Sequence, residues 1–142
     1  RDRDLAGFGV PNDYQATKRI RYGPCYGDDE TAPGKRSCRH LRDCVTEFGA
    51  QGLELDAVLL AWGTDFRLVD GWWNIDSARK YQRGGPPVRD AWQLRANAYR
   101  VLLTRARDAT VVFVPQLAEL DATYDYLVSS GFRPLSAGVD AH

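Results

Sequence analysis

The sequence predicts an α/β fold, in which short buried strands alternate with helices. Two nearly continuous apolar runs, at 57–62 and 110–114, are closed by Gly63 and Pro115. Runs of this length are typical of strands that are covered on both faces in a parallel sheet. Apolar side chains recur at helical spacing between the two runs. A layered domain with the order strand, helix, strand is therefore expected.

Residues 1–43 are expected to form an irregular N-terminal segment of the same domain. Gly and Pro divide this segment into turns, and a short strand is expected only near 19–22. The core is expected to span 44–142 and to begin with a strand at 44–48. A long loop is expected inside this core, at about 63–88.

The clearest helix is predicted from Val88 to about Arg107. Its apolar face repeats at helical spacing and contains Val88, Trp92, Ala96, Tyr99 and Leu103. A second helix is predicted over 117–129, with Gly131 as its terminator. The last predicted element is a short strand at 132–135. Because it contains Pro134, it is expected at the edge of the sheet.

Composition sets limits on the class of protein. The 142 residues suit one domain, and 19 basic residues balance 19 acidic ones. A free-standing nucleic-acid-binding protein usually has a basic excess, so such contacts are expected to be local or shared with another domain. We expect no membrane span and no signal peptide. An odd number of cysteines and their spacing favour the reducing cytoplasm. Methionine is absent even at position 1, so we expect an excised piece of a longer protein.

Thr104-Arg105-Ala106-Arg107 is the first of two segments suited to phosphate chemistry. It lies near the end of the predicted helix and leads into a buried strand. An arginine there offers a permanently charged, planar donor fork to phosphate oxygens. The alternative is a solvated arginine that is favoured by the helix dipole.

The second segment is the turn around Gln51-Gly52-Leu53-Glu54. Small residues in a turn let backbone amides approach a ligand, and Glu54 offers an acceptor to a ribose hydroxyl. The alternative is an ordinary turn with solvated polar residues. Neither segment is a phosphate-binding loop, because the chain contains no G-x-x-x-x-G-K-[ST] motif.

The turn at 51–54 and the segment at 104–107, which follow in this order about 50 residues apart, resemble motifs V and VI of superfamily 1 helicases. The turn at 51–54 is similar to Q-G-x-E-x-D, and the segment at 104–107 is similar to V-A-L-T-R-A-R followed by a strand. The wider pattern, over about 36–135, resembles the Schlafen group 3-like DNA/RNA helicase domain. Phe48 departs from it, because many relatives have His there. The resemblance implies the second RecA-like domain of a P-loop NTPase, with a mostly parallel sheet and flanking helices.

The resemblance also implies roles for individual residues. Arg105 would be the arginine finger of motif VI. A nucleotide would be contacted by Gln51, Gly52, Glu54 and Arg107. The nucleic-acid strand would pass near Thr46, with Arg100 as a helper. ATP and Mg²⁺ would be bound mainly by a preceding domain that carries the Walker A and B motifs.

Trp72 and Trp73 are further candidates for contact with nucleic acid, because exposed aromatic rings stack on bases. The alternative is that the pair anchors a loop to its own domain. A zinc site built from Cys25, Cys38, His40 and Cys44 is disfavoured by the spacing, so no metal ligand is expected. A Ser-His-Asp or Cys-His hydrolase has little support, because the only histidines are His40 and His142.

We therefore expect a C-terminal piece of an ATP-dependent helicase or translocase that acts on single-stranded DNA or RNA. The fragment alone is expected to be inactive and to bind no ATP. The alternative is a non-catalytic module, derived from a helicase half, that binds nucleic acid or protein. A weaker alternative is a domain that gates a fused nuclease.

Overall fold

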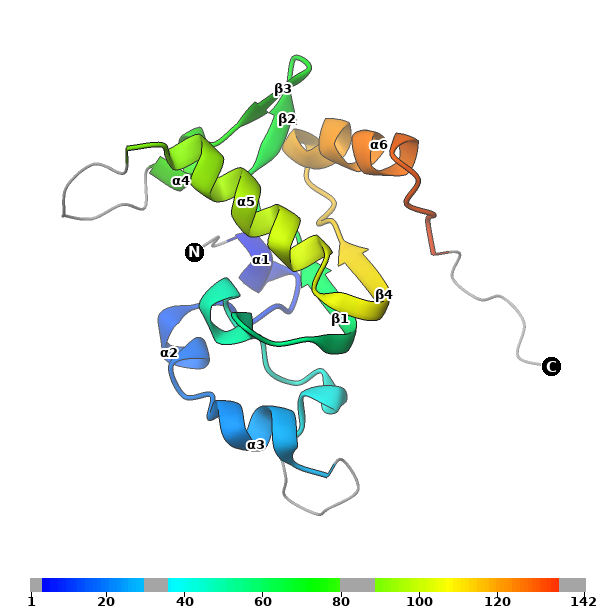
Figure 1. Cartoon of the computed structure of the whole chain (residues 1–142). Coiled ribbons are helices and arrows are strands. Elements are labelled where there is room, and N and C mark those ends of the chain that lie inside the picture. Colours follow the sequence, from blue (N-terminus) through cyan, green and yellow to red (C-terminus); the bar gives the residue numbers. More distant parts are fainter. Residues whose placement is uncertain (1–3, 30–35, 80–88, 136–142) are drawn as a thin grey trace.

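The computed structural model describes residues 4–29, 36–79 and 89–135, which form a mixed α/β fold (Figure 1). Its centre is a parallel pair of strands, β1 (Leu55–Ala61) and β4 (Ala106–Phe113). The long helix α5 (Ala91–Leu103) precedes β4 and lies along the pair. Parallel neighbours need such a crossover, because a tight turn cannot join them. The predicted α/β class and the strand–helix–strand order are confirmed.

One face of the strand pair is buried. Leu60 pairs in register with Val112, and both contact the main hydrophobic cluster. The cluster also contains Trp62 and Phe66 from the segment after β1, and Tyr99 from α5. Their rings pack closely, with the Trp62 and Tyr99 centroids 4.4 Å apart. Burial of such large rings is a main source of core stability.

The other face of the pair is only partly covered. Leu59 pairs in register with Val111, and Leu59 is 54% exposed. At the far end, Phe113 meets Phe8, which follows helix α1 (Asp4–Gly7), in an edge-to-face contact at 6.2 Å. The prediction that both faces are covered is therefore wrong at the Leu59 pair within the described residues.

The segment expected as a long loop contains a β-hairpin, formed by β2 (Arg67–Val69) and β3 (Trp72–Asn74), and then helix α4 (Asp76–Arg79). Asp70 and Gly71 join the strands with φ of 51° and 81°. Positive φ at both central positions is the geometry that Asp-Gly favours in two-residue hairpins. The rest of the expected loop, 80–88, lies outside the described residues, as does Val88 of the predicted helix.

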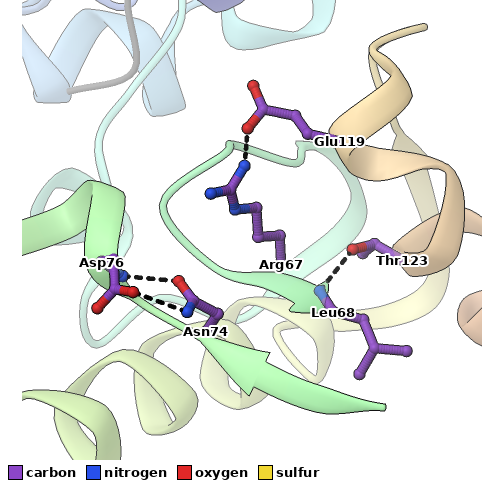
Figure 2. A network of polar contacts seen from close by, with 6 residues as sticks. All are labelled: Arg67, Leu68, Asn74, Asp76, Glu119 and Thr123. Atoms are coloured by element: carbon purple, nitrogen blue, oxygen red, sulfur yellow. Dashed lines mark hydrogen bonds and ion pairs between the residues drawn. The ribbon is translucent and has the colours of Figure 1, made fainter. Parts of the chain in front are cut away.

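Helix α6 (Asp121–Ser129) holds this hairpin in place (Figure 2). The Leu68 amide donates to the Thr123 hydroxyl at 2.9 Å, and Arg67 forms an ion pair with Glu119. Glu119 lies in the short 3-10 turn η3 (Ala118–Leu120) before α6. Thr123 is completely buried, so this polar contact replaces the one it would make with water.

The predicted terminator of the second helix is confirmed. Gly131 has φ 106°, its amide donates to Val128, and the Phe132 amide donates to Leu127. These two bonds form a Schellman motif, in which glycine takes the left-handed position. Residues 132–135 continue without regular structure, so the predicted edge strand is wrong.

Two other predicted strands are also wrong. Residues 47–50 form a 3-10 turn, η2 (Glu47–Ala50), instead of a strand from Cys44. Near the N-terminus, most of the strand expected at 19–22 is instead the link between helices α2 (Tyr14–Thr17) and α3 (Tyr22–Gly27), and the 3-10 turn η1 (Cys38–His40) follows. Within the residues that the structure describes, every helix falls short of the length and apolar character needed to cross a bilayer.

Candidate functional site

The parallel pairing brings the two candidate segments together. Leu55 and Ala106 are register partners at the start of their strands, and the Leu55 amide donates to the Arg105 carbonyl at 3.2 Å. The turn that precedes β1 and the link that precedes β4 therefore lie side by side. The register of the sheet, which no local pattern specifies, creates this proximity.

Arg105 points its guanidinium at the turn before β1. Nη1 donates to the carbonyl oxygen of Leu53 at 3.1 Å, and the side chain is half-buried. Nε of Arg105 is buried and has no hydrogen-bond partner among the described residues. No carboxylate of this part of the chain pairs with it, so its positive charge is not neutralised. A buried donor without a partner is costly unless a ligand or water satisfies it.

Helix α5 ends at Leu103, earlier than predicted, and Arg105 lies in the link between α5 and β4. Its amide still donates to the Leu102 carbonyl at 3.4 Å. The backbone of Arg105 is hydrogen-bonded on both sides, through its amide to Leu102 of α5 and through its carbonyl to Leu55 of β1. The Arg105 backbone is therefore held in place, and its side chain is directed by the Leu53 carbonyl.

The polar residues of the turn face solvent. Gln51 and Glu54 are exposed, and Gly52 has φ 76° with open space where a Cβ would be. Such a φ is strained for residues other than glycine, so Gly52 is required by the turn itself. The backbone of this turn is therefore open to a ligand, and Arg105 lies directly beside it.

Arg107 lies on β4 and is 70% exposed. It pairs with Asp56 of β1 at 2.5 Å and with Asp108 at 3.3 Å. Because two carboxylates already contact it, Arg107 is electrostatically different from Arg105. Arg100, near the end of α5, is exposed, and its carbonyl accepts from the Thr104 hydroxyl at 3.0 Å.

Thr46 caps the start of η2, and the Gly49 amide donates to its carbonyl at 2.9 Å. The next residue, Glu47, reaches Arg95 of α5, with Nη1 and Oε2 3.5 Å apart. Phe48, which departs from the family resemblance, is 70% exposed. The 3-10 turn thus places Phe48 at the surface, leaves Thr46 half-buried at its start, and is anchored to α5 through Glu47.

Arg95 is the centre of a polar network that the sequence did not indicate. It pairs with Asp65 at 2.9 Å, and Asp65 accepts from the Tyr99 hydroxyl at 2.7 Å. The same hydroxyl accepts from the Gly63 amide at 3.1 Å. Burial and the neighbouring Asp65 raise the pKa of Tyr99 well above its ordinary value. Arg95 and Tyr99 are four residues apart on α5, and this spacing was the only sign in the sequence that the two side chains lie on one helix face.

The two tryptophans have different environments. Trp72, at the hairpin end, is 81% exposed. The Trp73 ring stacks on Phe66 at 4.5 Å and meets Tyr126 edge-on at 5.3 Å. Its carbonyl also accepts from the indole of Trp92 at 3.2 Å. Trp73 therefore anchors the hairpin to its own domain, the alternative left open by the sequence, whereas Trp72 projects into solvent.

The cysteines do not converge on a metal. Within the residues that the structure describes, no group of three His, Cys, Asp or Glu side chains could hold an ion. Burial, then the neighbouring Cys38 and Asp43, raise the pKa of the Cys25 thiol. Burial raises the pKa of Cys44 as well. These are thiols that favour the neutral form and behave as small apolar groups.

A comparison with protein families places the chain among helicase-like domains. Residues 14–116 match the family described as Schlafen group 3, DNA/RNA helicase domain. Because the match covers most of the chain, the chain belongs to this family. The match begins further towards the N-terminus than the resemblance based on the motifs, so it includes α2 and α3. The comparison with curated proteins and the comparison with solved structures each gave no match.

Proposed function

We propose that this chain is the second RecA-like domain of an ATP-dependent helicase or translocase. In this proposal it supplies Arg105 to an ATP site that lies between two domains. Membership of the helicase-domain family supports the general class. The single observation that carries the specific role is the Arg105 side chain, held beside the open 51–54 turn with a buried Nε that lacks a partner.

The chemistry of this side chain fits a triphosphate. In phosphoryl transfer, negative charge develops on the γ-phosphate oxygens, and a positioned guanidinium stabilises it. Arg105 retains its charge because no described carboxylate pairs with it. One of its donors is used by the Leu53 carbonyl, which fixes its direction and leaves the others for an anion.

The same turn offers complementary contacts. Glu54 is exposed next to Leu53 and would accept from a ribose hydroxyl, whereas Gln51 and the Gly52 backbone would line the nucleotide. The chain has no phosphate-binding loop of its own. In the proposal, another domain therefore binds the phosphates and Mg²⁺, and closure of the two domains brings Arg105 to the γ-phosphate. Single-stranded DNA or RNA would pass near Thr46.

The test is ATP hydrolysis by the full-length protein that carries this domain, with and without single-stranded nucleic acid. Arg105→Ala should lower kcat by about 10³-fold or more and leave ATP binding nearly unchanged. The control is Arg133→Ala, because Arg133 is exposed, follows α6 and has no part in the proposed ATP site. This control should hydrolyse ATP like the wild type.

Comparable rates for Arg105→Ala and the wild type would contradict the proposed role. A wild-type protein that binds nucleic acid but hydrolyses no ATP would favour the non-catalytic module instead.

A further inference from the structure

The N-terminal segment contains a cluster of positive charge, although the net charge of the whole chain is zero. Lys18, Arg19 and Arg21 lie in the link between α2 and α3, and all three are exposed. We name these three residues the basic strip. Asp13, the acidic residue before α2, is used as a helix cap, because its Oδ1 accepts from the Ala16 amide at 2.9 Å. The stretch from 14 to 22 therefore has three positive charges and no negative one.

The basic strip has no counter-charge within residues 4–29, 36–79 and 89–135. Among the described residues, the one contact that its side chains make is Lys18 Nζ over the Tyr14 ring, at 5.1 Å from the centroid. Four other described cations each contact a carboxylate: Arg36, Arg67, Arg95 and Arg107. Three unpaired cations within four residues are the electrostatic pattern of a surface that binds phosphates.

The strip is attached to the turn that contains Thr46 and Phe48. Tyr22 begins α3 directly after the strip, and its ring packs on Gly49 of η2 so closely that a Cβ there would lie 2.6 Å from Cε1. Tyr26, one turn later in α3, donates from its hydroxyl to the Gly49 carbonyl at 3.1 Å. The strip and η2 therefore belong to one continuous surface.

Phe48 adds a stacking group to this surface. Its ring is 70% exposed in η2, although aromatic side chains are usually buried. Cations that follow a backbone, combined with an exposed ring, are the two parts of a site for single-stranded nucleic acid. The opposite end of the domain does not offer this combination, because acidic residues predominate there: Asp70, Glu119, Asp121 and Asp125.

We propose that the basic strip and Phe48 together bind a single strand of nucleic acid, with the strip on its phosphates and Phe48 on a base. The inference rests on the proposed function, because it supplies the strand-binding surface next to Thr46. It assigns a role to the N-terminal segment, for which the sequence predicts only irregular structure. The match to the helicase-domain family includes this segment.

The test is strand binding by the full-length protein without ATP, so that its outcome does not depend on Arg105. The probes are fluorescent oligothymidylate and oligouridylate of about 20 nucleotides, a length that exceeds common site sizes. The test variant is Lys18→Gln/Arg19→Gln/Arg21→Gln, and the control is Arg133→Gln. For a single strand, each phosphate contact contributes about 0.7 to the slope of log Kobs against log salt. The triple variant should therefore have a slope smaller by about 2, with affinity about 10- to 100-fold weaker near 0.1 M salt.

Phe48→Ala provides an independent measurement. It should weaken binding by about fivefold or more and leave the salt slope unchanged, because stacking releases no counterions. Arg105→Ala should bind the strand like the wild type. A comparison of the two probes shows whether DNA or RNA is preferred.

The inference would be overturned if the triple variant and Arg133→Gln had equal salt slopes, or if wild type bound neither probe. It would also be overturned if Trp72→Ala, but not the triple variant, weakened binding. A protein that lacks ATPase activity and still shows the expected slopes would remove the motor proposal and leave this surface in place.

Discussion

Arg105 Nη1 lies 3.1 Å from the carbonyl oxygen of Leu53, 52 residues earlier in the chain. The bond joins the link after α5 to the turn before β1, and the parallel register of β1 and β4 makes it possible. A backbone carbonyl orients a guanidinium without neutralising it, whereas a carboxylate does both. The Arg105 guanidinium is therefore oriented and keeps an unpaired positive charge, and both properties suit it to bind an anion.

Replacement of Arg105 by lysine separates charge from geometry. Lysine retains the positive charge but lacks the planar fork that reaches Leu53 and an anion together. We expect Arg105→Lys to lower kcat of the full-length ATPase by about tenfold or more, less severely than alanine does. Steady-state kinetics with both variants measures this order. Full activity of the lysine variant would mean that charge alone is sufficient and that the Leu53 contact has no role.

Arg95 should stabilise the fold more than Arg107 does. Arg95 connects Asp65 and Glu47 in a partly buried network, whereas Arg107 and Asp56 are about 70% exposed. Loss of a partly buried charged partner costs about 1–3 kcal/mol, and loss of an exposed pair about 0–1 kcal/mol. We expect Arg95→Met to lower the free energy of unfolding by the larger amount and Arg107→Met by the smaller. Urea unfolding of both variants decides the comparison, and equal losses would contradict it.

Tyr99 should make the fold sensitive to alkaline pH. Burial and then Asp65 raise the pKa of Tyr99 well above its ordinary value of 10.0, so its neutral form is favoured in the folded state. A raised folded pKa gives stability that is complete below the unfolded pKa and is lost as pH rises beyond it. We expect the free energy of unfolding to fall as pH rises above about 10.

The matched variant is Tyr99→Phe, which lacks the titrating group. It should be less stable at neutral pH, because the Gly63 amide loses its acceptor, and its stability should fall less steeply above pH 10. Unfolding curves at several pH values test this pair. Parallel pH profiles for Tyr99→Phe and wild type would contradict the assignment.

Two glycines in open space should respond to alanine with opposite signs. Gly71 has φ 81° at the hairpin turn, and Gly23 lies in α3 without a positive φ. Gly71→Ala should cost about 1 kcal/mol, because only glycine adopts that φ freely. Gly23→Ala should be neutral or stabilising by about 0.5 kcal/mol, because it lowers the entropy of the unfolded chain. Thermal unfolding measures both, and a destabilised Gly23→Ala with an unchanged Gly71→Ala would show that φ does not control these sites.

The sequence predicted the elements whose signals are local. The apolar runs around Leu60 and Val112 became the parallel strands, and Gly131 ended α6 as expected. The hairpin is also locally encoded, because Asp70-Gly71 between Val69 and Trp72 is a strong two-residue turn signal, although the prediction for this segment was a loop. The strand predicted at 44–48 is absent, because Glu47 forms an ion pair with Arg95 and Gly49 packs under the Tyr22 ring. Both are tertiary contacts, which the local sequence does not specify.

The candidate site divides in the same way. The types of residue at Gln51, Gly52, Glu54 and Arg105 could be recognised from spacing and resemblance. Their proximity depends on sheet register, and the Arg95 network depends on how α5 packs against the segment that follows β1, so neither is visible in a linear pattern. Whether Trp73 is packed or exposed could not be predicted for the same reason, because its partners Phe66 and Tyr126 lie outside the hairpin.

The most direct test of the central claim compares binding of ADP with binding of ADP–aluminium fluoride, a mimic of the transferring phosphate, to the full-length protein. An arginine finger acts on charge that develops in the transition state, so its removal should affect only the mimic. We expect Arg105→Ala to bind ADP like the wild type and to lose about 100-fold or more in affinity for ADP–aluminium fluoride. Equal affinity of Arg105→Ala and wild type for the mimic would contradict the claim that Arg105 reaches the γ-phosphate.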